Sequence, residues 1–105
     1  MIKVTVLYPN KPGSRFDVDY YLNVHMPLAI KRLDPVLKGV SVEIGVNGGT
    51  LDQAPPYAAI VGFTCESAQA FNEAFEPHSA ELMADILNYT DIEPVVQIGE
   101  IRILQ

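Results

Sequence analysis

Apolar and polar residues alternate along four segments of the chain, and each alternation predicts a β-strand. The first segment covers residues 2–8, and the second covers residues 40–46, where every second residue is valine or isoleucine. The third, YAAIVGFT at residues 57–64, is largely apolar at both its odd-numbered and its even-numbered positions, which is typical of a strand covered on both faces. The fourth lies within residues 93–104, where valine and isoleucine dominate.

Two other segments favour helices. The first is expected to run from Asp17, whose carboxylate can cap the first turn, to about Leu33. It should end there because Pro35 disfavours helical geometry in the residue before it. The second contains SAQAFNEAFE at residues 67–76. Pro77 interrupts this pattern, but it can also serve as the first residue of a continuation, HSAELMADIL.

The predicted order is β-α-β-β-α-β within one domain of residues 1–105, which indicates an α+β, ferredoxin-like fold. In this fold two helices cover one face of a four-stranded antiparallel sheet. Val61 and Phe63 are expected to place apolar groups on the other face, and a second copy of the chain would bury them sheet against sheet in a homodimer. The alternative is a monomer that leaves this face partly exposed to water.

Charge and hydropathy argue against several kinds of partner. A net charge of −6, with Lys31 and Arg32 as the only adjacent basic pair, disfavours binding to nucleic acid. No apolar run approaches the roughly 20 residues that cross a membrane, and the N-terminus alternates like a strand instead of resembling a signal peptide. We therefore expect a cytoplasmic protein with no membrane partner.

Cysteine and histidine are scarce in this chain. Cys65 is the only cysteine, so no internal disulfide can form. Together with His25 and His78 it falls short of the spacing typical of metal sites, and a carboxylate would have to complete any such site. We therefore expect no metal site.

The first predicted helix carries a histidine and a proline near its middle. At about 100° per residue, four of its side chains share one face within roughly 60°: Tyr21, His25, Leu28 and Arg32. Pro27 removes one backbone hydrogen bond and pushes on the carbonyl group four residues earlier. A helix kinked there is expected to leave a gap beside His25, where a ligand can lodge.

The sequence leaves two interpretations of His25 open. An imidazole changes charge near neutral pH, so His25 can act as a general acid or base, with Tyr21 one turn earlier as its partner. Alternatively, both residues are buried amphipathic side chains that pack in the core and satisfy one polar tip each.

The second predicted helical segment also has an apolar face that contains a histidine. The aligned residues are Phe71, Phe75, His78 and Leu82. Pro77 directly precedes His78, so each histidine adjoins a proline-containing turn, and both could face the space between the helices and the sheet. Asp85 and Glu81 are near enough in sequence to orient His78. Alternatively, His78 packs in the core and the two carboxylates are exposed to solvent.

Aromatic residues outside these faces complete the set of candidates. Tyr57 stands at the head of the third strand and Tyr8 at the end of the first, where each can line a pocket or pack in the core. Tyr20 occupies the helix strip next to Tyr21. The candidate substrate-binding residues are Tyr8, Tyr20, Tyr57 and Phe75.

Four stretches of the chain, taken in order, resemble the EthD domain proteins: FDVDYYLNVHMPLA, PPYAAIVGF, PHSAELMADI and NYTDIEPVVQIGEI. The most specific of these features is the aromatic pair followed by H-x-P-L, and the resemblance covers nearly the whole chain. It implies the ferredoxin-like protomer of the dimeric α/β-barrel superfamily. It also places Tyr20, Tyr21, His25, Pro27 and His78 on patterned positions of the family.

The resemblance implies a function only in outline. EthD takes its name from a cluster for degrading ethyl tert-butyl ether, where it accompanies an oxygenase system. Related dimeric barrels include cofactor-free monooxygenases and polyketide cyclases, in several of which His and Tyr side chains near a cavity transfer protons. Other relatives bind haem, but a chain of this size has little room to enclose it, so no cofactor is expected.

Two hypotheses follow. The first is a cofactor-free enzyme, oxidoreductase-like or a cyclase or decarboxylase, that acts on an aromatic or polyketide-like compound. In it His25 is the general base or acid, Tyr21 its partner and His78 a second polar contact. The second is a non-catalytic binding or accessory protein that uses the same pocket to store or deliver a small hydrophobic molecule.

Overall fold

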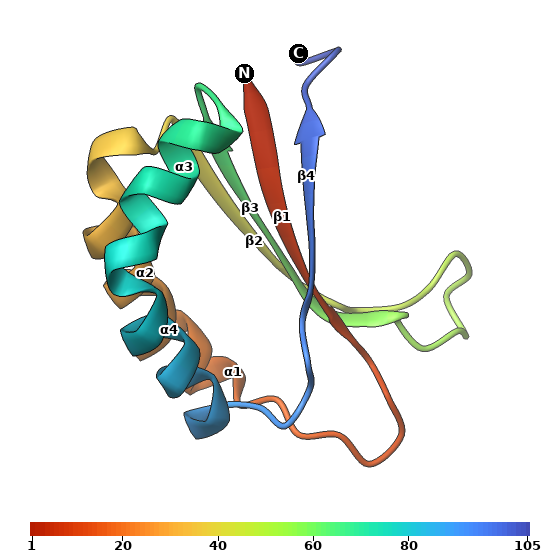
Figure 1. Cartoon of the computed structure of the whole chain (residues 1–105). Helices are drawn as coiled ribbons and strands as arrows, with labels where there is room; N and C mark the ends of the chain where they lie inside the picture. Colours follow the sequence, from red (N-terminus) through yellow and green to blue (C-terminus); the bar gives the residue numbers. More distant parts are fainter.

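The four strands form one antiparallel sheet, and the helices cover one of its faces. The computed structural model describes the whole chain, residues 1–105. The strands are β1 (Ile2–Pro9), β2 (Gly39–Ile44), β3 (Tyr57–Cys65) and β4 (Val95–Glu100), and they lie in the order β2-β3-β1-β4. One helical segment contains α1 (Val18–Tyr20) and α2 (Met26–Leu33), and the other contains α3 (Ala68–Phe75) and α4 (Ser79–Asp85) (Figure 1). This arrangement confirms the predicted β-α-β-β-α-β order and the ferredoxin-like fold.

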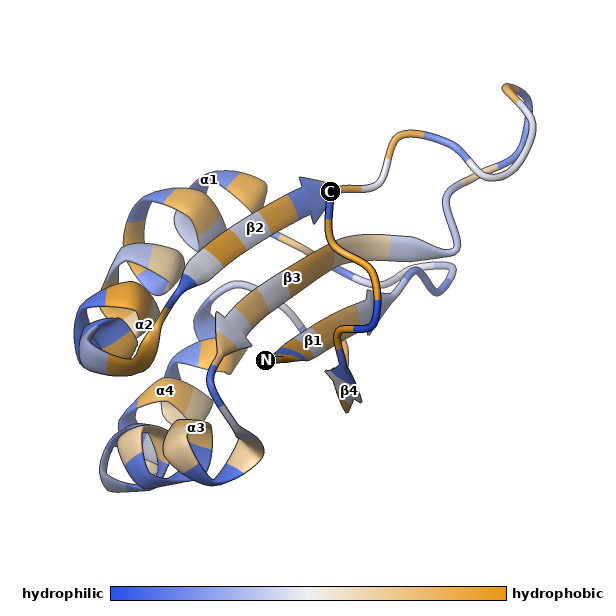
Figure 2. Ribbon diagram, turned by 90° about the horizontal axis from the view of Figure 1, so that it is seen from above, coloured by the Kyte–Doolittle hydropathy of each residue, from blue (hydrophilic) through white to orange (hydrophobic).

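The strand register decides which residues face the helices. Val4 of β1 lies opposite Phe63 of β3, and Val6 lies opposite Val61. Val61 and Phe63 are both buried on the side that the helices cover. The helices all lie on one side of the sheet, and hydrophobic residues occur along β1 and β3 (Figure 2). The prediction that these two residues cover the outer face is therefore wrong. Because the odd-numbered and the even-numbered positions of β3 are both largely apolar, its sequence pattern does not distinguish the two faces of the sheet.

The first helical segment begins and ends as predicted. The Asp17 carboxylate accepts a hydrogen bond from the backbone N–H of Tyr20 at 3.1 Å, which satisfies a free donor of the first turn. The α-helical geometry ends at Leu33, and a 3₁₀ turn, Asp34–Val36, follows with Pro35 inside it.

The predicted irregularity near Pro27 is a π-helical turn, Tyr21–His25. The backbone N–H of Met26 bonds to the carbonyl of Tyr21, five residues earlier. Pro27 has no N–H, and in a regular α-helix its ring would press on the carbonyl of Asn23. A wider turn at this place relieves that clash, and such turns are frequent at functional sites.

The π-helical turn changes which side chains of α2 are buried. Ala29 and Leu33 are buried, whereas Leu28 and Arg32 are only half-buried. An extra residue in the wider turn rotates everything that follows it, so the inward face moves on by one position. The prediction of one continuous face is correct before this turn and wrong after it.

The second helical segment is also interrupted. Ser67 caps α3 by accepting a hydrogen bond from the backbone N–H of Ala70 at 3.1 Å. A 3₁₀ turn, Glu76–His78, then separates α3 from α4. This turn winds more tightly than an α-helix and breaks the predicted apolar face, so His78 does not share the surroundings of Phe75.

Candidate functional site

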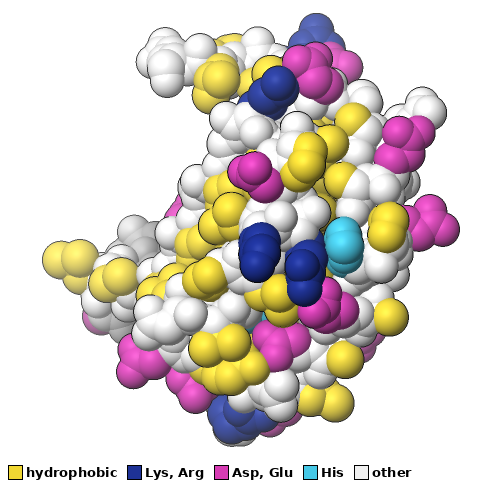
Figure 3. All heavy atoms as spheres, turned by 90° about the vertical axis from the view of Figure 1, so that its left-hand side faces the viewer, with side chains coloured by type: hydrophobic (Ala, Val, Ile, Leu, Met, Phe, Trp, Pro, Cys, Tyr) yellow, Lys and Arg dark blue, Asp and Glu magenta, His cyan; other side chains and the backbone are white.

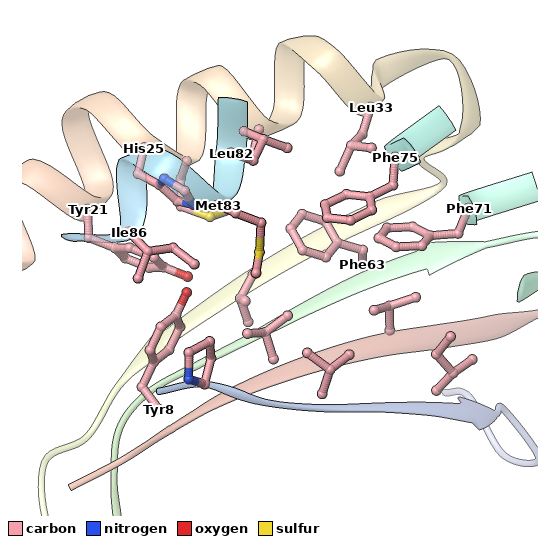
Figure 4. A pocket seen from close by; sticks show the side chains of 18 of the residues that line it. Tyr8, Tyr21, His25, Leu33, Phe63, Phe71, Phe75, Leu82, Met83 and Ile86 are labelled. Carbon is pink, nitrogen blue, oxygen red and sulfur yellow. The ribbon is translucent and has the colours of Figure 1, made fainter. Parts of the chain in front are cut away.

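A cavity of about 240 Å³ lies between the sheet and the two helical segments. Strands β1, β3 and β4 form its floor, and the helices form its roof (Figure 4). Nineteen residues line it, and 16 of them are hydrophobic. No lysine, arginine, aspartate or glutamate is among them. A molecule bound here would therefore be mostly apolar and uncharged.

The two ends of the cavity differ in chemistry (Figure 4). The aromatic end is formed by Leu33, Phe63, Phe71 and Phe75. The polar end is formed by Tyr8, Tyr21 and His25. At the aromatic end, the rings of Phe71 and Phe75 are stacked with centroids 5.6 Å apart. The cavity thus offers hydrocarbon contact at one end and hydrogen bonds at the other.

The cavity opens to the surface between α4 and β4. Met83 of α4 and Val96 and Ile98 of β4 line it, yet these side chains remain 58%, 58% and 43% exposed. A ligand would enter past apolar side chains at this edge of the sheet.

His25 is the titratable group of the polar end, and Asp85 holds it in place. The imidazole Nδ1 lies 2.8 Å from Asp85 Oδ2, and the two side chains are 10% and 13% exposed. His25 comes from the π-helical turn, and Asp85 is the last residue of α4. Since Nδ1 is engaged by a carboxylate, Nε2 is the ring nitrogen available to a molecule in the cavity.

The second oxygen of the Asp85 carboxylate is also occupied. Oδ1 accepts hydrogen bonds from the Tyr20 hydroxyl at 2.6 Å and from Asn88 Nδ2 at 3.0 Å. Burial alone would raise the pKa of Asp85, but the hydrogen bonds from Tyr20, Asn88 and His25 outweigh it and hold this pKa below its ordinary value. The carboxylate is therefore charged at neutral pH and can stabilise a protonated imidazole.

Two tyrosine rings fix the plane of the His25 imidazole. The Tyr21 ring stacks on it with centroids 5.6 Å apart and 15° between the planes. The Tyr89 ring lies on it at 4.6 Å and 51°. The Tyr89 carbonyl also accepts a hydrogen bond from the backbone N–H of Asp17 at 2.7 Å, which ties the start of one helical segment to the end of the other. The imidazole is thus positioned by packing as well as by Asp85.

Three tyrosine hydroxyls meet below this imidazole. The hydroxyls of Tyr8 and Tyr89 are 2.8 Å apart and hydrogen-bonded. The hydroxyl of Tyr21 is buried without a hydrogen-bond partner, and it points toward that of Tyr8 (Figure 4). Burial raises the pKa of all three tyrosines, so they keep their protons at neutral pH.

The structure brings together most of the residues predicted for the site. Those that line the cavity are Tyr8, Tyr21, His25 and Phe75. Tyr20 lies outside the lining, but it contacts the site through its hydrogen bond to Asp85. His78 and Tyr57 are half-buried elsewhere, and neither lines the cavity.

Asp85 and Tyr89 are the site residues that sequence spacing does not assign. Spacing relates Asp85 to His78, seven positions away on the same segment, whereas its partner in space is His25. Glu81, the other carboxylate near His78 in sequence, pairs instead with Arg32 at 2.9 Å. On the face of the molecule that the helices form, basic and acidic side chains lie next to one another (Figure 3). The only signal for Tyr89 is its place within one of the family-like stretches.

The rest of the chain offers no competing metal site. No group of three or more His, Cys, Asp or Glu side chains is placed to hold a metal ion. The thiol of Cys65 is buried in β3, and burial raises its pKa. None of the helices has the length and apolarity that crossing a membrane requires.

The chain is similar to known proteins of solved structure. No family model matches the chain, and no curated protein matches it. An EthD-like protein from Ralstonia eutropha is 42% identical, over 99% of this chain and 94% of its own, with a TM-score of 0.94. An EthD family protein from Bacillus halodurans is 19% identical, over 95% of this chain and 97% of its own, with a TM-score of 0.65.

An antibiotic biosynthesis monooxygenase is 13% identical, over 96% of this chain and 98% of its own, with a TM-score of 0.54. At such low identity, the similarities to this monooxygenase and to the Bacillus halodurans protein demonstrate a shared fold only. The similarity to the Ralstonia eutropha protein extends over almost the full length of both chains in sequence as well as structure. The chain therefore belongs to the EthD family.

Proposed function

We propose that this protein is a small enzyme that binds an apolar organic molecule in the cavity and moves a proton on it with His25. The observation that carries the proposal is the 2.8 Å contact between His25 Nδ1 and Asp85 Oδ2 beside the cavity. A carboxylate on one imidazole nitrogen fixes the tautomer whose other nitrogen accepts a proton, and it stabilises the imidazolium that forms. His25 is thus the general base, and Asp85 is its positioning residue.

This arrangement suits a substrate with an acidic C–H bond beside a carbonyl group. The C–H bond breaks, the proton goes to Nε2 of His25, and the electron pair moves into an enolate whose charge lies on the carbonyl oxygen. Reaction of the enolate with O₂ would make the net reaction an oxidation, and the similarity in fold to an antibiotic biosynthesis monooxygenase motivates this route. Attack on a second carbonyl of the same molecule would instead close a ring.

The size and lining of the cavity support an aromatic or polyketide-like substrate. An engineered cavity of about 150 Å³ binds benzene, so a volume of about 240 Å³ has room for roughly ten non-hydrogen atoms by the same scale. The stacked rings of Phe71 and Phe75 at the aromatic end favour a flat ring system there.

A deuterium-exchange assay tests the proposal without knowledge of the natural substrate. The probe is 2-tetralone, a bicyclic ketone of suitable size, and NMR follows the exchange of its α-protons in D₂O. The wild-type protein is expected to accelerate exchange above the buffer rate, and His25→Asn should lower that acceleration by roughly a hundredfold. His78→Asn is the matched control, because it removes an imidazole that lies outside the cavity, and its rate should equal that of the wild type.

Other outcomes of this assay have a definite meaning. If 2-tetralone binds but exchanges at the buffer rate, the protein is a binding or accessory module and not an enzyme of this kind. If His78→Asn loses as much activity as His25→Asn, His78 belongs to the machinery after all, and the cavity alone does not define the site.

We also propose that the protein is a homodimer. Strand β4 is an edge of the sheet, and its Val95, Val96 and Ile98 side chains are exposed, as are Ile103 and Leu104 beyond it. An exposed edge with apolar side chains favours pairing with another chain, and a second copy would also border the cavity mouth. Sedimentation should give a species of about 23 kDa, twice the chain mass of 11.5 kDa. A species with the mass of one chain would refute the homodimer.

A further inference from the structure

The Tyr21 hydroxyl is the one buried side-chain polar atom of the protein that makes no hydrogen bond of regular geometry, and it faces the Tyr8 hydroxyl. The residue is fully buried, and it lines the cavity. A buried hydroxyl without a partner costs stability, and such groups in native proteins call for an explanation. Because this hydroxyl lies at the polar end of a cavity, a bound molecule can supply the missing acceptor.

The Tyr8 hydroxyl provides a second donor at the same place. The rings of Tyr8 and Tyr21 meet edge to face with centroids 5.6 Å apart, and their oxygens point toward one another (Figure 4). A hydroxyl has one proton to donate and two lone pairs to accept with. When Tyr89 donates to Tyr8 across their 2.8 Å contact, the Tyr8 proton is free to point at a ligand.

Both groups keep a proton that they can donate to a ligand at neutral pH. Burial raises the pKa of Tyr8 and of Tyr21, which keeps the two phenols protonated. No lysine or arginine lines the cavity, and the imidazole of His25 is already paired with the Asp85 carboxylate. A carboxylate head group would therefore be buried without a counter-charge, which is costly, whereas a neutral carbonyl oxygen accepts two hydrogen bonds readily.

We propose that Tyr21 and Tyr8 form a cradle for the carbonyl oxygen of the ligand, and that this cradle makes the cavity selective for neutral ketones over hydrocarbons and carboxylates. The role of this cradle in the reaction depends on the proposed function. The imidazole of His25 is stacked on the Tyr21 ring, so a carbonyl oxygen held by Tyr21 brings the neighbouring C–H bond to the same end of the cavity as His25. As this bond breaks, charge moves to the oxygen, and the two donors bind the enolate more strongly than the ketone.

Calorimetric binding of three probes of similar size tests the cradle. The probes are 2-tetralone, tetralin, which lacks the oxygen, and 4-ethylbenzoate, a carboxylate with as many non-hydrogen atoms as 2-tetralone. Tyr21→Phe is expected to weaken 2-tetralone binding by roughly three- to tenfold while leaving tetralin unchanged. The affinity for 2-tetralone divided by the affinity for tetralin is compared between the wild type and the variant. A difference in solubility between the two probes affects this ratio equally in both proteins. Tyr57→Phe is the matched control, since it deletes a phenol hydroxyl outside the cavity, and it should leave the ratio as in the wild type.

The outcomes separate the cradle from the proton transfer. An unchanged ratio in Tyr21→Phe, or 4-ethylbenzoate binding as tight as that of 2-tetralone, overturns the cradle. If binding depends on Tyr21 but exchange proceeds at the buffer rate, the cradle is supported and catalysis by His25 is refuted. Failure of every probe to bind overturns both. Should Tyr21→Phe not fold, Tyr8→Phe makes the same test, with a smaller expected shift because Tyr8 also bonds to Tyr89.

Discussion

His25 and Asp85 are 60 positions apart in the chain, yet their side chains meet at 2.8 Å. The contact joins the two helical segments at the polar end of the cavity, because the π-helical turn directs His25 inward and α4 ends at Asp85. Tyr20 and Asn88 hold the other carboxylate oxygen, so Asp85 cannot turn away without losing further hydrogen bonds. The same residues therefore position the imidazole and connect the helices.

Replacing Asp85 by asparagine should impair proton transfer while keeping a side chain of the same shape. An amide can donate to Nδ1, which favours the tautomer whose Nε2 already carries a proton and cannot accept another. We expect the accelerated deuterium exchange of 2-tetralone to fall roughly a hundredfold. Glu81→Gln, one turn earlier on α4 and paired with Arg32 at the surface, is the control and should keep full activity. Equal losses in both variants would mean that general disruption of α4 explains the effect.

The Asp85 carboxylate should also make stability depend on pH. Its pKa is held below the ordinary value of 3.8 in the folded protein, so it contributes stability that is fully present above that value and is lost as the pH falls through the lower, folded-state pKa. Urea unfolding of the wild type and of Asp85→Asn should therefore differ more at about pH 6 than at about pH 2. A difference that grows on acidification would have the wrong sign for this explanation.

Removal of the Tyr89 hydroxyl and removal of the Tyr21 hydroxyl should affect stability differently. Tyr89→Phe deletes the 2.8 Å hydrogen bond to Tyr8, so it should lower the free energy of unfolding by about 1 kcal/mol. Tyr21→Phe deletes a hydroxyl that has no partner and should leave stability unchanged or raise it. Urea unfolding compares the two. A larger loss in Tyr21→Phe would show that its hydroxyl is satisfied within the protein.

Filling the cavity from α2 should prevent binding without touching the hydrogen-bonded groups. Ala29 lines the cavity roof and is buried, so Ala29→Met places a flexible apolar side chain where the ligand would lie. Affinity for 2-tetralone should fall at least about tenfold, as expected when a ligand loses its apolar contacts. Leu28→Met is the control, because Leu28 does not line the cavity. If only the Leu28 variant lost affinity, the shift of the buried face after the π-helical turn would be contradicted.

The fold could be predicted because its signals are local. Strand alternation, the caps at Asp17 and Ser67, and the prolines each act within a few residues of the elements that they define. The shared helix face indicated His25 and Tyr21 as site residues, the family resemblance placed both on patterned positions, and both line the cavity. By contrast, the face to which Val61 and Phe63 point could not be predicted, because apolar and polar residues do not alternate in this strand.

The partner of His25 could not be predicted because it depends on how two helical segments are rotated. The π-helical turn Tyr21–His25 and the 3₁₀ turn Glu76–His78 each change that rotation, and neither follows from the spacing of apolar residues. A regular helix would keep His78 on the face of Phe71 and Phe75, which is where the sequence places it. In the folded chain Asp85 takes the position beside the cavity, and His78 lies outside it.

The central claim is that His25 and Asp85 act as one unit in proton transfer. The most direct measurement is the exchange rate of 2-tetralone α-protons in D₂O for the wild type, His25→Asn, Asp85→Asn and the double variant. We predict a rate well above buffer for the wild type, and a double variant no slower than His25→Asn, because Asp85 acts only through His25. Losses that multiply in the double variant, or a wild-type rate equal to that of buffer, would contradict the claim.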